Sequence, residues 1–212
     1  MYGRAGEEVL YFRQHGFEPV VIPGVSSALA APTFAGIPVT QRGVADSFII
    51  CTGVGRQGRE VKLPGYDRGR TLIVLMGVAR ITQVLEALME EANGKSSRRD
   101  GPAYPHNTPI AIIERGSMPD QRIVSSTLKN IAAALDCASE QRPPGMIVIG
   151  WAVLALWGKG DVGVLDEGPE RDEERVKEWL GDANWRIVEG LDRVWDGLTC
   201  NSMPITTYCD FR

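Results

Sequence analysis

The stretch from residue 20 to residue 42, VVIPGVSSALAAPTFAGIPVTQR, constrains the fold of this chain more than any other. Its β-branched start predicts a buried strand over 18–22, and Pro23-Gly24 then fixes a sharp turn. Ser26 is placed to cap a helix over 26–35. A strand, a turn and a capped helix are typical of a small-molecule site at the carboxyl end of a strand, and also of an ordinary, tightly packed helix.

The rest of the chain predicts an α/β protein. An amphipathic helix is expected over 4–15, and a helix followed by a strand favours a parallel sheet. Pro38 to Val44 is interpreted as a linker. Beyond it, the pattern predicts strands over 47–53, 71–76, 109–114, 122–126 and 145–150, and helices over 80–92 and 127–136.

Two charged stretches interrupt or follow this pattern. Residues 93–107 are polar, and their cluster of Lys95, Arg98 and Arg99 allows an anion site but is typical of a solvated insertion. The charged tail from residue 166 to residue 212 is predicted to contain a helix from Pro169 to Leu180. Neither stretch indicates a function.

Composition excludes several classes of protein. The net charge of −4 over 212 residues does not favour nucleic-acid binding, and no apolar run approaches the ~20 residues of a membrane span. With two histidines and four widely spaced cysteines, no metal site is expected. The cysteines are interpreted as reduced thiols of a cytoplasmic protein.

The stretch that begins at residue 21, VIPGVSSALAAPTFAGIPVTQRG, resembles a block of the tetrapyrrole methylase family, in particular of its uroporphyrinogen-III C-methyltransferases. Other blocks of the family follow in the same order, and the resemblance covers roughly residues 1–155. They read MYGRAGEE at the start, TLIVLMG from residue 71, TPIAIIERGS from residue 108 with QR at 121–122, and PGMIVIG from residue 144.

The resemblance implies the C-terminal part of a two-domain fold. Residues 1–42 would be the remnant of an N-terminal parallel-sheet α/β domain, residues 43–165 a complete C-terminal mixed-sheet α/β domain, and residues 166–212 a charged tail. The family's Gly-rich GxGPGD opening and its GDP stretch are not in this sequence. We therefore expect a truncated chain that is inactive, or nearly so, by itself.

The resemblance also implies an activity. It is the S-adenosylmethionine-dependent C-methylation of uroporphyrinogen III to precorrin-2, in siroheme and corrinoid biosynthesis. The carbon nucleophile would be the substrate's own pyrrole ring, so no catalytic residue is expected in this chain. Members of the family are usually homodimers, which predicts a homodimer here.

Five residues match cofactor-contacting positions of the family: Met1, Ser26, Ser27, Met76 and Gly116. Gly145 is a weaker sixth candidate. A tetrapyrrole with eight carboxylates needs arginines, which pair bidentately with carboxylates. The candidates in matching blocks are Arg4, Arg42 and Arg122, although each fits a surface or ion-paired arginine equally well.

Two other hypotheses stay open at this point. The chain could be another methylase of the same fold, acting on a different precorrin, as a diphthine synthase or as a ribosomal-RNA methylase. It could also be a residual dimerisation or interaction module without enzymatic activity.

Overall fold

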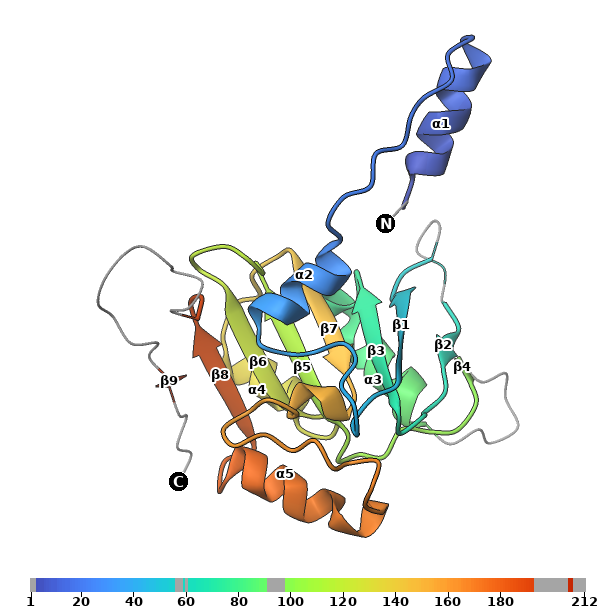
Figure 1. Cartoon of the computed structure of the whole chain (residues 1–212). Helices are drawn as coiled ribbons and strands as arrows, with labels where there is room; N and C mark the ends of the chain where they lie inside the picture. Colours follow the sequence, from blue (N-terminus) through green and yellow to red (C-terminus); the bar gives the residue numbers. More distant parts are fainter. Residues whose placement is uncertain (1–2, 56–58, 60, 91–97, 193–205, 208–212) are drawn as a thin grey trace.

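Five strands that the sequence predicts lie in one mixed sheet (Figure 1). The computed structural model describes residues 3–55, 59, 61–90, 98–192 and 206–207. The predicted strands are confirmed, each within one residue of its expected ends. They are β1 (Ser47–Thr52), β3 (Arg70–Leu75), β5 (Pro109–Glu114), β6 (Arg122–Thr127) and β7 (Gly145–Ile149).

The sheet has the order β1-β3-β7-β5-β6-β8-β9. β1 and β3 are parallel, and every other neighbouring pair is antiparallel. Two strands of this sheet were not predicted: β8 (Trp185–Glu189), which pairs with β6, and β9 (Thr206–Thr207), which pairs with β8. A separate small sheet joins β2 (Leu63–Pro64) to β4 (Arg99–Asp100). The mixed-sheet α/β class is thus confirmed.

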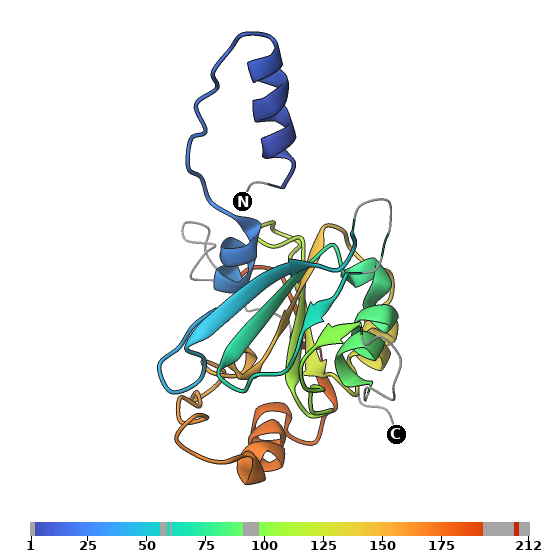
Figure 2. The same ribbon diagram turned by 90° about the vertical axis from the view of Figure 1, so that its right-hand side faces the viewer.

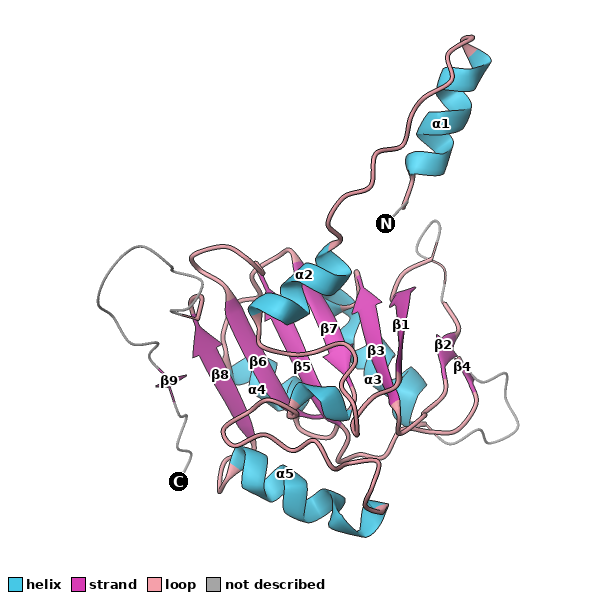
Figure 3. Ribbon diagram, in the orientation of Figure 1, coloured by secondary structure: helices cyan, strands magenta, loops and turns pink. Residues whose placement is uncertain are grey.

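Helices cover both faces of the sheet, as Figures 2 and 3 show. On one face, α3 (Ile81–Met89) and α4 (Ile131–Cys137) pack with inward residues of the central strands. On the other lie α2 (Ser27–Phe34), α5 (Asp172–Leu180) and the short helix η3 (Trp151–Val153). Because β3, β5 and β7 are covered on both faces, they carry continuous apolar runs.

The predicted first helix is confirmed as α1 (Ala5–Gln14), whereas the buried strand over 18–22 is wrong. Residues 17–26 have no regular structure, and Val20 and Ile22 are 86% and 82% exposed. A strand needs a neighbour for its backbone groups, and no described segment pairs with this one. Residues 3–25, which we call the arm, project from the described residues 26–192, the body (Figure 1).

The interpretation of residues 93–107 as a solvated insertion is wrong at Arg99. Arg99 is buried and donates to the carbonyl oxygens of Ala87 and Leu88, at 2.7 and 2.9 Å, and of Glu90 at 2.9 Å. These carbonyls lie in the last turn of α3, where no helical amide remains to satisfy them. Arg99 thus caps α3, and Lys95 lies outside the described residues.

The predicted linker from Pro38 to Val44 packs against later residues of the body and does not run freely through solvent. Val44 is fully buried, and the amide of Leu165 donates to the carbonyl of Gly43 at 2.8 Å. A side chain at Gly43 would collide with the carbonyl of Val162, 2.0 Å from its Cβ position. The turn therefore anchors the chain where β1 begins.

Charged side chains hold the predicted tail helix, confirmed as η4 (Pro169–Arg171) and α5, to the body. The guanidinium of Arg68 contacts both carboxylate oxygens of Asp172, at 2.6 and 2.7 Å. Buried Arg175 contacts Asp161 at 2.8 Å and also pairs with Glu167. The division at residues 42 and 165 stays a prediction, with β8 of the third part paired to β6 of the second.

Within the described part of the chain, no helix is long and apolar enough to cross a membrane. Cys51 and Cys137 are free thiols there.

Candidate functional site

The carboxyl ends of β1, β3 and β5 meet at one edge of the sheet, which we call the upper edge. β1 is parallel to β3, and β3 and β5 run the same way because β7 is antiparallel to both. The chain leaves these strands at Gly53, at Met76-Gly77 and at the turn of Arg115–Ser117. The edge at which α/β strands end is where such sheets generally bind ligands.

Backbone strain is concentrated at the upper edge. Met76, Arg115 and Ser117 have φ angles of 56°, 51° and 71°, in the left-handed region that side chains disfavour. Such residues cost about 1–3 kcal/mol each and cluster at ligand sites. Elsewhere among the described residues, only Ser139 combines a side chain with a positive φ. The upper edge is thus marked out from the rest of the sheet.

Two glycines bring the ends of β1 and β3 unusually close. A Cβ atom at Gly53 would lie 2.7 Å from the Cα atom of Gly77, which leaves no room for a side chain. The amide of Gly53 donates to the carbonyl of Leu75 at 2.7 Å. This part of the edge therefore presents bare backbone, which a ligand can approach closely.

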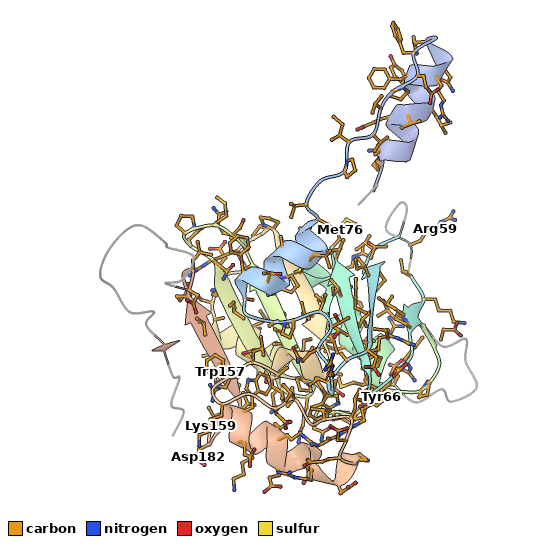
Figure 4. The ribbon with its side chains drawn as sticks, in the orientation of Figure 1. Arg59, Tyr66, Met76, Trp157, Lys159 and Asp182 are labelled. Carbon is orange, nitrogen blue, oxygen red and sulfur yellow. The ribbon has the colours of Figure 1, made fainter. Side chains whose placement is uncertain are left out.

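Met76 lies at this edge with its side chain 64% exposed (Figure 4). It is therefore not a core residue, although it follows directly on an apolar strand. The strand ends at Leu75, and the left-handed conformation of Met76 turns the chain toward Gly77. An exposed thioether on a fixed backbone offers an apolar, polarisable surface to a planar ring.

Helix α2 is capped as predicted, because the hydroxyl of Ser26 accepts from the amide of Ala28 at 3.3 Å. Ser27 is exposed at the first position of the helix. The helix lies against the turn of β5, where a Cβ atom at Gly116 would lie 2.8 Å from the Cβ of Ala31. Gly116 thus lets α2 approach, and the structure brings Gly116 and the helix that carries both serines together.

Gln121 belongs to a block that matches the family, but the sequence did not make it a candidate site residue. Its side chain is fully buried between the turn and α2. Its carbonyl oxygen accepts from the amide of Ser117 at 3.0 Å, and its amide nitrogen donates to the carbonyl of Phe34 at 3.3 Å. Both partners are backbone groups, four and 87 residues away, so no local sequence pattern could identify them.

The assignment of Arg122 to a substrate carboxylate is not supported. Its guanidinium is 1% exposed and donates to Glu114 at 2.6 Å, to the carbonyl of Glu140 at 2.8 Å and to the carbonyl of Ala138. These contacts occupy its nitrogens inside the body. Arg122 instead compensates the buried carboxylate of Glu114, which ends β5 just before the strained turn.

The remaining candidates lie apart from one another. Arg4 pairs with Glu7 at 2.8 Å on the exposed α1, away from the body. Arg42 is exposed at the opposite edge of the sheet, where β1 begins. Gly145 begins β7 at the upper edge, with Val78 3.1 Å from its Cβ position. Met1 lies outside the described residues.

The turn that follows β5 carries an exposed ion pair. The guanidinium of Arg115 lies 2.6 Å from the carboxylate of Asp120, and this hydrogen bond holds the pKa of Asp120 below its usual range. Asp120 is exposed, so the pair is worth little stability. The upper edge thus combines strained backbone, an exposed thioether and one exposed ion pair.

A cavity of about 250 Å³ adjoins Gln121 on the α2 face of the sheet. It lies between the end of α2 and strands β6 and β8, with a largely aromatic and aliphatic wall. The side chains that form most of this wall are Phe34, Ile123, Val153, Trp157, Trp179 and Val188.

Comparison with known proteins identifies the family. The family model for Tetrapyrrole (Corrin/Porphyrin) Methylases matches residues 1–132, which include every candidate cofactor and substrate residue except Gly145. The chain belongs to this family. A probable uroporphyrinogen-III C-methyltransferase of Schizosaccharomyces pombe is 43% identical over 156 residues, and the uroporphyrinogen-III C-methyltransferase of Methanocaldococcus jannaschii is 36% identical over 158.

The matches cover 74% of this tetrapyrrole methylase chain, but 29% of the S. pombe protein and 61% of the M. jannaschii protein. A crystal structure of uroporphyrin-III C-methyl transferase from Thermus thermophilus, complexed with S-adenyl homocysteine, has a TM-score of 0.53 and 34% identity. That alignment covers 72% of this chain and 62% of the other. Residues beyond 132, including α5 and β8, lie outside the family match.

Proposed function

We propose that this tetrapyrrole methylase chain takes part in the S-adenosylmethionine-dependent C-methylation of uroporphyrinogen III to precorrin-2, a step toward siroheme and corrinoids. The observation that carries the proposal is the strained upper edge, where Met76, the turn at Gly116 and α2 meet the requirements of a donor site. The relatives named above, and the T. thermophilus structure with S-adenyl homocysteine, support the same activity.

The residues of the upper edge fit the methyl donor by their chemistry. The exposed thioether of Met76 suits an adenine ring, and the bare backbone near Gly53 suits polar edges that need close approach. Ser27, at the start of α2, offers a hydroxyl, while the hydroxyl of Ser26 is engaged in the cap. Gly116 contributes by having no side chain, which lets α2 lie close to the turn after β5.

The donor, when bound, supplies an activated methyl group, so the residues of this chain would act by binding and orientation. The methyl group would pass from the sulfonium to a pyrrole carbon of the substrate, leaving a neutral thioether, and the methylated ring would then release its N–H proton to solvent. Arg42 and Arg4 are exposed, and each would pair with substrate carboxylates, Arg4 by exchanging its ion pair with Glu7. We further propose that the protein is a cytoplasmic homodimer.

Calorimetric titration of the 212-residue chain with S-adenosylhomocysteine tests the donor site. We expect saturable binding with one site per chain. The matched pair Met76→Ala and Leu156→Ala compares a methionine of the upper edge with a similarly exposed apolar residue beyond η3, at the opposite end of the strands. Only Met76→Ala should weaken binding. Absence of binding by the unmodified chain, or equal weakening in both variants, would contradict the proposal.

A second candidate is an interaction module without catalytic activity, and the apolar surface of the arm favours it. Phe17, Val20, Ile22 and Val25 are between 67% and 89% exposed, which is unusual for a contiguous segment. Light scattering coupled to size exclusion distinguishes the two. A stable assembly that binds no S-adenosylhomocysteine supports this candidate over the first.

A further inference from the structure

Gln121 occupies the point at which three parts of the body meet. It directly precedes β6, its main-chain carbonyl accepts from the amide of Gly190 at 2.7 Å, and its side chain lies between the Arg115–Ser117 turn and α2. It is fully buried although it is polar. A buried amide must find partners for both ends, so its contacts fix its position.

The orientation of this side chain is unambiguous. The partner at one end is a donor, the amide of Ser117, and the partner at the other end is an acceptor, the carbonyl of Phe34. The carbonyl oxygen of Gln121 must therefore face Ser117 and its amide nitrogen must face Phe34. Reversing the group would leave two like atoms facing each other at both ends.

Each partner belongs to one of the two elements of the proposed donor site. Ser117 is one of the strained residues of the turn, with φ at 71°. Phe34 ends α2, which begins at Ser27 directly after the cap residue Ser26. Its carbonyl lies in the last helical turn, where backbone acceptors need an outside donor. Gln121 therefore connects the turn to the helix through one rigid side chain.

We propose that Gln121 is a positioning residue of the donor site, which fixes α2 and its serines against the Arg115–Ser117 turn. The inference rests on the proposed function, because it takes the two elements to be walls of one cofactor site. The tight contact between Gly116 and Ala31 sets the distance between the elements. The two hydrogen bonds of Gln121 set their angle and hold Ser117 in its strained conformation.

A conservative substitution tests this role. Gln121→Met replaces the side chain by an unbranched, flexible one of similar size that can neither donate nor accept these hydrogen bonds in the same way. This variant removes both hydrogen bonds. Val124→Ala is the matched control, because Val124 lies on the same β6 but packs in the cluster on the opposite face, with α3 and α4.

The experiment measures two properties of the full chain in each variant. One is the Kd for S-adenosylhomocysteine by calorimetry, and the other is amide hydrogen exchange over residues 26–37 and 114–121. We expect Gln121→Met to raise the Kd on the order of tenfold, the factor that corresponds to one ordinary hydrogen bond, and to speed exchange in both segments. In a separate thermal melt, Val124→Ala should lower the Tm about as much as Gln121→Met does, while leaving the Kd and the exchange of both segments unchanged.

Two results would overturn the positioning role. One is an unchanged Kd and unchanged exchange in Gln121→Met. The other is an equal rise in Kd in Val124→Ala, which would make the effect one of general stability. If the unmodified chain binds no S-adenosylhomocysteine, the proposed function fails separately. Hydrogen exchange alone then tests whether Gln121 connects the turn to α2. Faster exchange confined to the two segments supports this connection, and unchanged exchange refutes it.

Discussion

The arm and the body both contain runs of β-branched apolar residues, but these are buried in a strand in the body and exposed without regular structure in the arm. In the body, Ile73 and Val74 lie in β3 and are fully buried between two layers of helices. In the arm, Val20 and Ile22 form no strand and are 86% and 82% exposed. The residue types are the same, so intrinsic β propensity cannot explain the difference. What differs is the presence of paired strands and covering helices around them.

The comparison predicts that the largest effects of mutation lie beneath the upper edge of the body. Arg122→Ala would leave the carboxylate of Glu114 buried without its partner, at a cost of about 3–5 kcal/mol in the free energy of unfolding. Urea denaturation measures this loss. The control is Arg4→Ala on the arm, whose exposed ion pair should contribute close to nothing. A loss below about 1 kcal/mol for Arg122→Ala would contradict the account.

A pair of glycines gives the next largest contrast. Gly116→Ala places a methyl group 2.8 Å from the Cβ of Ala31, so α2 must move, which typically costs about 1–3 kcal/mol. Gly24→Ala in the arm meets nothing within 4 Å and should change stability by less than about 0.5 kcal/mol. Thermal unfolding of both variants measures the difference. Equal effects would show that α2 is not held tightly against the turn.

Alkaline pH should act on the body through Cys51. Burial raises the pKa of this thiol to about 11 from its ordinary 9.0. A raised pKa in the folded state gives stability that is complete below pH 9 and is lost as the pH rises toward 11. After allowance for partial exposure, we expect about 1–2 kcal/mol.

Urea titrations between pH 8 and pH 11 test this expectation by comparing the original chain with Cys51→Ala. The variant should lose less stability over this window, whatever its stability at pH 8. In the arm, Arg13 lowers the pKa of Glu18, but the pair is exposed and should add no comparable pH dependence. If the free energy of unfolding falls with pH at the same rate in both proteins, Cys51 has no such role.

The smallest effect is expected for an apolar residue of the arm. Ile22→Ser should change the free energy of unfolding of the body by less than about 0.5 kcal/mol, because the side chain packs against nothing in the body. Ile147→Ala, in the centre of β7, should cost about 2–5 kcal/mol. Chemical denaturation of both variants compares them. A large loss for Ile22→Ser would mean that the arm packs on the body in solution.

Much of the body could be predicted from the sequence, because its strands are continuous apolar runs bounded by turn residues. β5 and β7 begin and end within one residue of the expected bounds. The capped start of α2 also followed from Ser26, since a cap depends on residues two or three positions away. Local patterns were sufficient wherever the deciding contacts are local.

Prediction failed where contacts over long sequence distances decide. Arg99 caps α3 through carbonyls 9 to 12 residues earlier, and Gln121 reaches Phe34 across 87 residues. Arg122 was assigned to a ligand because the pattern shows an arginine but not Glu114, its buried partner eight residues away on the paired strand. Met76 could be placed at the end of β3, but its exposure depends on its left-handed backbone.

The central claim is that α2, Met76 and the Arg115–Ser117 turn form one donor site on the body. Hydrogen exchange of the whole chain with and without S-adenosylhomocysteine tests it most directly. We predict ligand-dependent protection confined to residues 26–37, 52–55, 75–79 and 114–121, with no change in α1 or α5. Protection elsewhere, or no protection at the upper edge under saturating ligand, would contradict the claim.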